Sequence, residues 1–195
     1  MRDIMDAEAL SKIIKTRRSI RSFTPDDISD EVLGRLLNDA TWAPSGKNYQ
    51  NWKFFVVRKE KIKDFLQVFQ AAWTFVKPTL EQKLKPKALS ATEKFFLTLG
   101  NAPVVILAFS EIYPTEDSLV TYGSVFMAVQ NLLLLAHAEG LGTCVLGRVK
   151  EVNHQIMKLT GVTNMEFICG VALGHPDTQA FTPVPARKEG KITFI

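Results

Sequence analysis

The sequence contains little cysteine and histidine, the residues most often used to build disulfide frameworks and metal sites. Its 195 residues include two cysteines, Cys144 and Cys169, and three histidines that lie far apart. No pair of them has the spacing of a zinc site, so we expect no metal centre. The chain opens on a polar, amphipathic segment rather than a secretory signal. This opening favours a cytoplasmic protein with reduced thiols.

The sequence also lacks a long run of like charge and an uninterrupted apolar stretch. The net charge of +4 is small and the basic residues form no extended block, which argues against a nucleic-acid partner. The longest apolar segment, 118–140, is interrupted by the polar residues Gln130 and Asn131. A membrane span needs about 20 apolar residues in a row. We therefore interpret this segment as a buried core helix and expect no membrane contact.

The remaining composition suits a globular chain, since 46% of the residues are hydrophobic and 23% are charged. We expect a single domain over residues 1–195. Helical periodicity and short apolar runs alternate irregularly, which predicts a mixed α+β fold rather than repeated βαβ units. The predicted helices end near residue 18, follow Ser29 to about 40, and cover about 60–75, 118–140 and 152–159; the predicted strands are 53–58, 103–110, 166–174 and 191–195.

Three segments are expected to lie outside this regular frame. Residues 77–96 are charged and contain two prolines, which predicts an exposed excursion over the body. Residues 140–147, "GLGTCVLG", are rich in glycine and predict a close-approach turn. Val145 stands where a dinucleotide-binding fingerprint needs its third glycine, so that motif is absent. A proline-rich arm then leads to the apolar strand 191–195, which indicates pairing with another subunit.

The segment "TRRSIRSF" is the first of four motifs suited to binding a ligand. It places Arg17, Arg18 and Arg21 around Ser19, close to apolar residues. Arginine presents a planar fork that binds phosphate through two hydrogen bonds, and the serine hydroxyl can assist. The alternative is a solvated basic patch at a helix end, where cations interact favourably with the helix dipole. The segment alone does not decide between the two.

The other three motifs are individually weaker. "APSGKNYQNW" clusters Ser45, Asn48 and Gln50, whose donors and acceptors can read a planar heterocycle, although an ordinary polar loop has the same composition. "GLGTCVLG" offers backbone amides that could face a flat ring. Arg187, in the C-terminal arm, either is solvated or completes an anion site from the far end of the chain.

Taken in order along the chain, "RRSIRSF", "PSGKNYQNW", "GLGTCVLG" and the arginine of the C-terminal arm resemble the nitroreductase family of FMN flavoproteins. The resemblance spans nearly the whole chain. It implies an α+β fold with a central, mostly antiparallel sheet flanked by helices. It also implies a homodimer that exchanges its C-terminal arms and holds FMN at the subunit interface.

The resemblance assigns the FMN site to four parts of the chain. The Arg-Arg-Ser segment would bind the phosphate, and the third arginine would lie near the flavin N1–C2=O edge. The loop that begins at Pro44 would reach the isoalloxazine and ribityl chain, usually from the partner subunit. The glycine-rich turn would lie against the ring, and the C-terminal arginine would close on the phosphate. The residues so assigned are Arg17, Arg18, Ser19, Arg21, Pro44, Ser45, Asn48, Gln50, Leu146, Gly147 and Arg187.

The implied activity is hydride transfer from NADH or NADPH, through FMN, to a nitroaromatic, quinone or related acceptor. The flavin N5 carries this chemistry, so no catalytic side chain is assigned. Two positions depart from the family pattern: Asn51 replaces a common proline, and Val145 replaces a common tryptophan. We expect both changes to alter the shape of the pocket and the choice of acceptor rather than the binding of FMN. The alternatives are a reductive dehalogenase or flavin-consuming enzyme on the same scaffold, an FMN-binding protein without turnover, and a domain whose arginines are merely solvated. The lysines of 77–96 would favour anionic acceptors.

Overall fold

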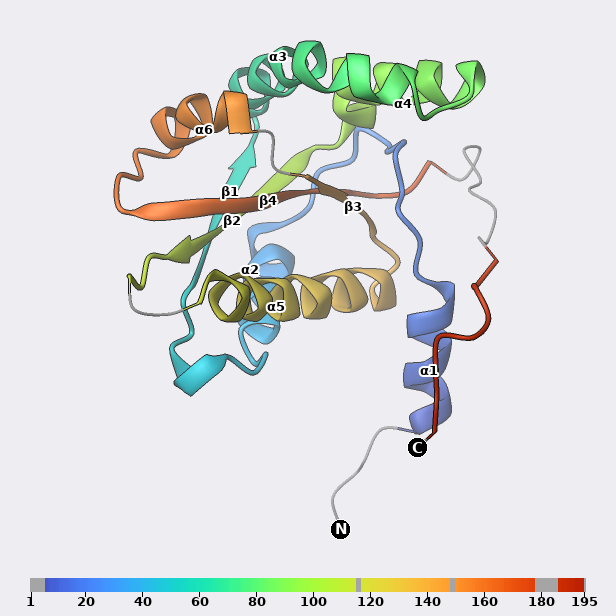
Figure 1. The fold of residues 1–195 in the computed structure, drawn as a ribbon, viewed down its shortest axis with the longest axis vertical. Coiled ribbons are helices and arrows are strands. Elements are labelled where there is room, and N and C mark those ends of the chain that lie inside the picture. The colour runs from blue at the N-terminus through green and yellow to red at the C-terminus, as the bar shows by residue number, and fades with distance from the viewer. Residues whose placement is uncertain (1–5, 115–116, 148–149, 178–185, 195) are drawn as a thin grey trace.

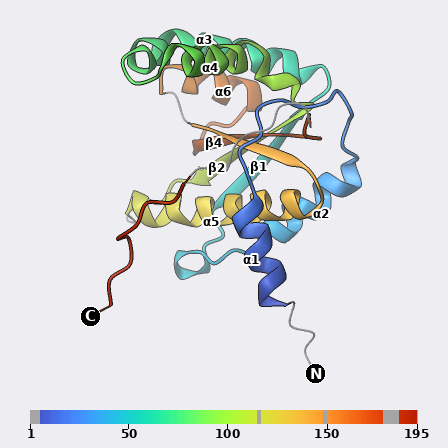
Figure 2. The same ribbon diagram turned by 90° about the vertical axis from the view of Figure 1, so that its right-hand side faces the viewer.

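A computed structural model describes residues 6–114, 117–147, 150–177 and 186–194, and these residues form three layers (Figure 1). The middle layer is an antiparallel four-stranded sheet with the strand order β1-β2-β4-β3. Helices α2 and α5 cover one face, and α3, α4 and α6 cover the other (Figures 1 and 2). The elements are α1 (Ala7–Thr16), α2 (Asp30–Ala40), β1 (Trp52–Arg58), α3 (Lys61–Glu81), α4 (Pro86–Thr98), β2 (Val104–Glu111), α5 (Ser118–Ala138), β3 (Gly142–Leu146), α6 (Asn153–Thr160) and β4 (Met165–Gly174), with short 3₁₀ turns at Gly46–Asn48, Leu99–Asn101 and Lys150–Val152.

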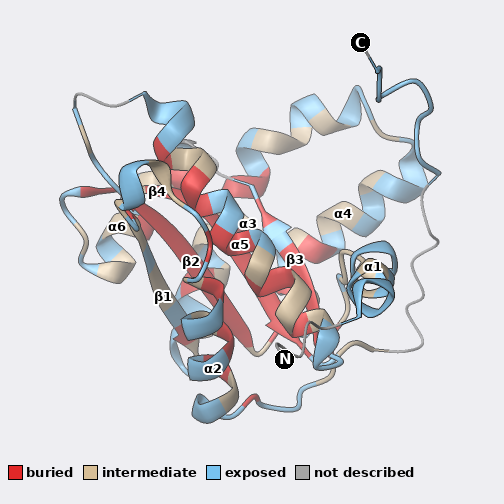
Figure 3. Cartoon of the chain, turned by 90° about the horizontal axis from the view of Figure 1, so that it is seen from below, coloured by how far each residue is buried: buried red, intermediate tan, exposed pale blue. Residues whose placement is uncertain are grey.

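The two central strands, β2 and β4, are the continuous apolar runs of the sequence. Successive side chains of a strand point to opposite faces, so a strand covered on both faces needs apolar residues throughout. In β2, Ile106 belongs to the core under α2 and α5, whereas Leu107 belongs to the core under α3 and α6. Figure 3 shows the buried residues concentrated in these strands and on the adjoining helices. The predicted α+β fold with an antiparallel sheet is confirmed.

Helix α5 is the long apolar segment of the sequence. It has the length and the mean hydropathy, 1.6, that a membrane span requires. However, Val125, Val129 and Leu132 are buried against the sheet and α2, as in the core helix of a globular protein. The opposite side of the helix leaves Phe126 and Met127 exposed. The predicted core helix is therefore present, with one apolar side that the described part of the chain does not cover.

The stretch 77–96, expected as an exposed excursion outside the regular frame, is mostly exposed but regular, because it completes α3 and forms α4. Pro86 occupies the first turn of α4, where a missing N–H costs no helical hydrogen bond, and Pro78 lies in the last turn of α3. The rings of Phe69 and Phe96 stack with centroids 4.4 Å apart. Aromatic packing between the two helices therefore holds them together on the outer side of the sheet.

Two further expectations are corrected by the structure. The glycine-rich stretch contains the strand β3, which pairs with β4, rather than consisting of a turn. Residues 191–194 form no strand within the single chain, and Ile192 and Phe194 are 79% and 96% exposed; the pairing of this segment with another subunit stays a prediction. The first half of the arm, 178–185, and Ile195 lie outside the described residues.

Candidate functional site

The arginine-rich segment runs along the outer edge of β3. The backbone N–H of Ile20 donates to the carbonyl oxygen of Thr143 at 2.8 Å, and Ser19 forms a parallel bridge with the same residue. The N–H of Phe23 donates to the carbonyl oxygen of Gly100, also at 2.8 Å, and its ring is buried. The segment thus covers a sheet edge that would otherwise carry unpaired backbone groups. The two apolar residues anchor it, and this fixes the backbone of Arg21 between them.

The three arginines have different surroundings. The Nη1 of Arg18 donates to the carbonyl oxygens of Lys15 and Arg17 at 2.7 and 2.6 Å, so this side chain caps the end of α1. Its Nε is buried and has no hydrogen-bond partner. Within the described residues, neither Arg17 nor Arg21 nor Arg18 forms an ion pair with a carboxylate. The interpretation as a basic patch at a helix end therefore accounts for the Nη1 contacts of Arg18. It does not account for Arg17 and Arg21, which have no ion-pair partner among the described residues.

A histidine that carries no local sequence signal joins this cluster. His137, in the last turn of α5, forms a hydrogen bond of 2.9 Å with the hydroxyl of Thr16. Its pKa is lowered from its usual value, first by burial and then by the charges of Arg17 and Arg18. Burial raises the pKa of Cys144 on β3, and the charges of Arg21 and Arg17 oppose that shift. The cations therefore gather where the end of α5 meets β3. The contact between Thr16 and His137 could not be predicted from their positions in the sequence.

The predicted amide loop forms a compact turn at the opposite end of α5. The N–H of Gln50 donates to the hydroxyl of Ser45 at 2.9 Å, and its side-chain amide donates to that of Asn48 at 3.3 Å. The N–H of Gly46 donates to the hydroxyl of Ser124 on α5 at 3.2 Å. Asn48 and Gln50 have a left-handed backbone, which asparagine tolerates better than most residues. These two amides are exposed, as is Pro44 at the start of the loop.

Asn51 holds this loop in place, a role that the sequence did not indicate. The residue is 1% exposed, and its side-chain amide donates to the hydroxyl of Ser110 at 2.7 Å and to the carbonyl oxygen of Thr121 at 3.0 Å. Its own carbonyl oxygen accepts from the N–H of Glu111 at 2.8 Å. Asn51 therefore joins the loop to the end of β2 and the first turn of α5. It acts on the position of the loop rather than on the wall of a pocket.

The loop and the arginines cannot meet within one chain. Ser124 contacts the loop and His137 contacts the arginine segment, and both lie on α5. Thirteen residues separate these two positions, which corresponds to roughly 20 Å along a helix that rises about 1.5 Å per residue. Figure 1 shows the loop and α1 beyond opposite ends of α5. The structure therefore places the predicted binding residues in two separate groups.

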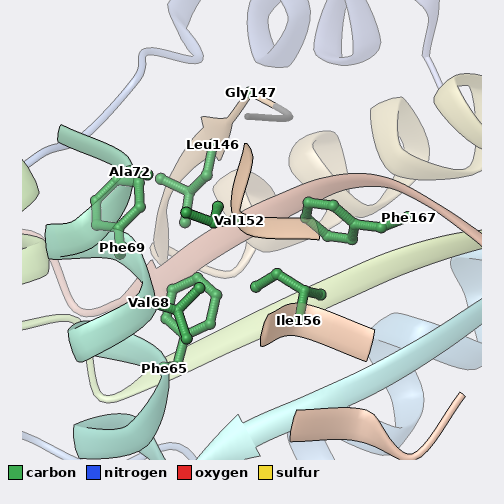
Figure 4. Close-up of a pocket in the computed structure, with 9 residues that line it drawn as sticks. All are labelled: Phe65, Val68, Phe69, Ala72, Leu146, Gly147, Val152, Ile156 and Phe167. Carbon is green, nitrogen blue, oxygen red and sulfur yellow. The ribbon is translucent and has the colours of Figure 1, made fainter. Parts of the chain in front are cut away.

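Leu146 and Gly147 lie at the end of β3, close to the first group. Leu146 is buried among side chains of α3 and α6, which converge on it around a small apolar crevice (Figure 4). The crevice measures about 20 Å³, room for about one water molecule. Leu146 is thus a core residue, whereas Gly147 is exposed beside it. Neither the crevice nor its lining offers a site for a planar ring.

Arg187 lies apart from both groups. It is exposed in the described part of the C-terminal arm, and it forms no hydrogen bond or ion pair with the residues that the structure describes. Across those same residues, no cluster of histidine, cysteine and carboxylate side chains could hold a metal ion. The arm therefore presents Arg187 to solvent in the single chain.

Comparisons with known proteins agree with this architecture. A protein of Archaeoglobus fulgidus, whose name provisionally describes it as an NADH dehydrogenase/NAD(P)H nitroreductase, is 30% identical over 174 residues, which cover 87% of this chain and 86% of that protein. An iodotyrosine deiodinase of Thermotoga neapolitana is 32% identical over 139 residues, which cover 69% and 71%. The crystal structure of the FMN-dependent nitroreductase NfnB from Mycobacterium smegmatis in complex with NADPH superposes with a TM-score of 0.80 at 18% identity, covering 97% of this chain and 98% of that one. The model of the nitroreductase family matches residues 14–175, most of the sequence, and the chain therefore belongs to the nitroreductase family.

Proposed function

We propose that the protein is an FMN-dependent oxidoreductase that uses NADH or NADPH to reduce a small-molecule acceptor, such as a nitroaromatic compound or a quinone. The observation that carries the proposal is the buried Nε of Arg18, which has no hydrogen-bond partner among the described residues, in a cluster of three arginines that form no ion pair with a described carboxylate. Buried polar groups almost always have hydrogen-bond partners, and the adjacent charges of the half-buried Arg17 and Arg18 favour a bound anion. A dianionic phosphate group supplies both to this cluster.

The residues present fit FMN in the following roles. Arg17, Arg18 and the hydroxyl of Ser19 would hold its phosphate, and Arg21 would place a positive charge at the N1–C2=O edge of the flavin. When bound, FMN supplies the exchange of a hydride between a nicotinamide and an acceptor. The chain itself binds and orients the reactants, and no acidic or histidine side chain is needed for proton transfer. Reduced nicotinamide and acceptor would bind in turn.

The second group of residues would come from another copy of the chain. The amide loop and the arginines lie about 20 Å apart along α5, too far for both to contact one end of a ligand. The uncovered side of α5 carries Leu119, Phe126 and Met127, all exposed, and such contiguous apolar surface is typical of an interface. A two-fold dimer about α5 would bring Asn48 and Gln50 of one subunit to the arginines of the other. The arm with Arg187 would then close on the phosphate.

A second candidate function is reductive dehalogenation. It is favoured by the 32% identity to the deiodinase of Thermotoga neapolitana, over 69% of this chain. The same cofactor site would serve both activities, and only the acceptor would differ. Turnover of nitroarenes and quinones with NADH or NADPH, set against release of halide from halogenated phenols, separates the two.

The proposed function is tested by the absorbance spectrum of the purified protein. We expect a yellow protein whose flavin band is bleached when NADH or NADPH is added without oxygen. A yellow protein that neither nicotinamide bleaches would support FMN binding without turnover. A colourless protein that gains no thermal stability from added FMN would overturn the proposal.

The phosphate assignment has a direct mutational test. Arg17→Ala and Arg187→Ala should each weaken FMN binding about 10- to 100-fold, because each removes a charge-assisted hydrogen bond worth about 1.5–3 kcal/mol. Titration of the flavin-free protein with FMN measures the affinity. Lys158→Ala, an exposed lysine of α6 outside both groups, is the matched control and should bind FMN like the wild type. Wild-type affinity in both arginine variants would reject the assignment.

A further inference from the structure

A groove lies between α4 and the arginine segment, on the side of the sheet that α3 and α6 also cover. Arg21 and Ser22 form one wall, Lys94 and Phe95 of α4 form the other, and Asn101 lies at one end. Its volume is about 540 Å³, within the range of about 300–1,000 Å³ usual for small-molecule sites. The apolar crevice at Leu146 is smaller by more than an order of magnitude. The groove therefore has room for a single-ring aromatic compound.

The groove carries uncompensated positive charge. Arg21 and Lys94 both line it, no aspartate or glutamate does, and neither cation forms an ion pair within the described residues. The neighbouring Glu93 faces α3, where it accepts hydrogen bonds from the indole of Trp73 at 3.0 Å and from Lys77 at 3.3 Å. An anion entering the groove would thus meet two cations from opposite walls.

The donors in the groove also favour an anion over a neutral hydroxyl compound. The hydroxyls of Thr92 and Thr98 already donate to carbonyl oxygens of their own helix, each at 2.8 Å. The hydroxyl of Ser22 donates to Asp177 at 3.2 Å, a carboxylate that does not line the groove. The charged groups of Arg21 and Lys94 and the side-chain amide of Asn101 remain as donors. A carboxylate, which only accepts hydrogen bonds, matches such a set.

The two walls are held at a fixed separation. Gly100 has a φ of +62°, and a Cβ built on it would lie 2.2 Å from the carbonyl oxygen of Arg21, so the backbones meet there as only glycine allows. Leu99 and Phe95, at the end of α4, are buried in the core. The groove is therefore formed before any ligand arrives, and little ordering is required on binding.

We propose that this groove binds the carboxylate of anionic aromatic acceptors, of the nitrobenzoate class, and that Lys94 selects for that charge. The proposal rests on the proposed function, because Arg21 is the residue assigned to the flavin edge and the groove begins at Arg21. An acceptor held there by its carboxylate extends its ring toward the cofactor site. Lys94 thus acts as a specificity-determining residue, distinct from the phosphate-binding arginines.

The test compares pairs of ligands that differ in charge alone. Calorimetry on the flavin-loaded protein measures the binding of benzoate and of neutral benzamide, and kcat/KM is measured for 4-nitrobenzoate and 4-nitrobenzamide. We expect the wild type to prefer the acid in both pairs, and Lys94→Gln to lower each preference about fivefold, the upper range for an exposed ion pair. Lys94→Arg should keep the preference, and Lys158→Gln on α6 should not change it. High salt should reduce it in the wild type.

Two results would overturn the proposal. One is a wild type that does not prefer the acid, and the other is a Lys94→Gln variant whose affinity and kcat/KM fall equally for the acid and the amide. Failure of the proposed function has a different signature. A protein that neither binds flavin nor turns over nitroarenes would overturn that function. Calorimetry of benzoate binding to the flavin-free protein would then test the anion site in the groove on its own. Binding that depends on Lys94 there would support the anion site, and binding that does not would reject it.

Discussion

The two ends of α5 hold the two groups of predicted binding residues, and they do so by different physical means. At the end of the helix that carries His137, Arg17 and Arg18 lie beside β3, and no carboxylate among the described residues pairs with them. At the end that carries Ser124, the amide loop has one charged side chain, Lys47, whose Nζ lies over the ring of Tyr49, and its polar groups bond to one another. The first end thus has cations available for an anionic ligand, whereas the second satisfies much of its hydrogen bonding internally.

This difference explains why the whole of α5 matters to the site. The helix has 21 residues and so spans about 30 Å, and it is rigid because one side is buried in the core. It keeps the two groups of one chain apart. Pairing of its uncovered side with a second copy would let the arginine end of each helix meet the amide loop of the other copy. Separating the copies should therefore have the largest effect.

Phe126→Glu should break the proposed pairing. A carboxylate on the uncovered apolar side of α5 would have to be buried in a dimer interface, at a cost of several kcal/mol. We expect a monomer whose affinity for FMN falls about 100-fold or more, since the contacts of the second group are lost together. Light scattering after size exclusion and FMN titration measure both effects.

Phe75→Glu is the matched control for this variant. Phe75 is about as exposed as Phe126, but it lies on α3, on the opposite side of the sheet. It should remain dimeric and bind FMN normally. A monomeric Phe126→Glu protein with wild-type affinity for FMN would show that one chain holds the whole site.

Asn51→Ala tests the end of α5 that carries the amide loop. It removes a buried amide that donates to Ser110 and Thr121, which should destabilise the fold by about 1–3 kcal/mol. For a chain of this size the melting temperature should fall by about 2–4 °C per kcal/mol. Affinity for FMN should fall severalfold, because the loop loses its attachment to α5. Thermal denaturation and FMN titration on the same samples measure the two changes.

Asn48→Ala provides the contrast. This side chain is exposed on the same loop, so its loss should weaken FMN binding at a smaller cost in melting temperature than Asn51→Ala, the remaining cost being the strain of alanine at a left-handed position. If Asn51→Ala left both stability and affinity at wild-type values, the loop would owe its position to other contacts.

The sequence predicted the parts of the fold whose signal is local. Strands β2 and β4 are continuous apolar runs, and α2 begins at the Ser29 cap, whose side chain accepts from the N–H of Val32. β3 was missed because its glycines suggested a turn. Gly142 instead leaves room for the side chain of Ile20, because a Cβ at position 142 would lie 2.9 Å from that side chain. The strand depends on pairing with β4, a contact that spacing along the chain does not reveal.

The candidate site divides in the same way. The motifs identified which residues could bind a ligand, because arginine forks and amide clusters are properties of short segments. The contact between Thr16 and His137 joins residues 121 positions apart, and the buried position of Asn51 depends on where β2 ends. The distance between the two groups along α5 likewise follows from packing. These features required the structure because each depends on elements remote in sequence.

The smallest expected effect is a pH dependence confined to the cationic end. Burial and the charges of Arg17 and Arg18 lower the pKa of His137, so the folded chain binds its proton less readily than the unfolded chain. Folding stability is therefore lost as the pH falls through the unfolded value of about 6.5 toward the lower folded value. We expect flavin-free protein to lose about 2 °C more of melting temperature between pH 7.5 and 5.5 than His137→Gln does.

Bound FMN should reduce that difference, because a phosphate between Arg17 and Arg18 would offset their charge and raise the pKa of His137 toward its usual value. Melting temperatures of the wild type and His137→Gln, each with and without FMN at both pH values, test this. His154→Gln, an exposed histidine of α6, should follow the wild type throughout. Equal pH slopes for the wild type and His137→Gln would mean that neither burial nor the arginines lower the pKa of His137. A slope that FMN leaves unchanged would place the phosphate away from this end of α5, and the two ends would then differ in charge without differing in function.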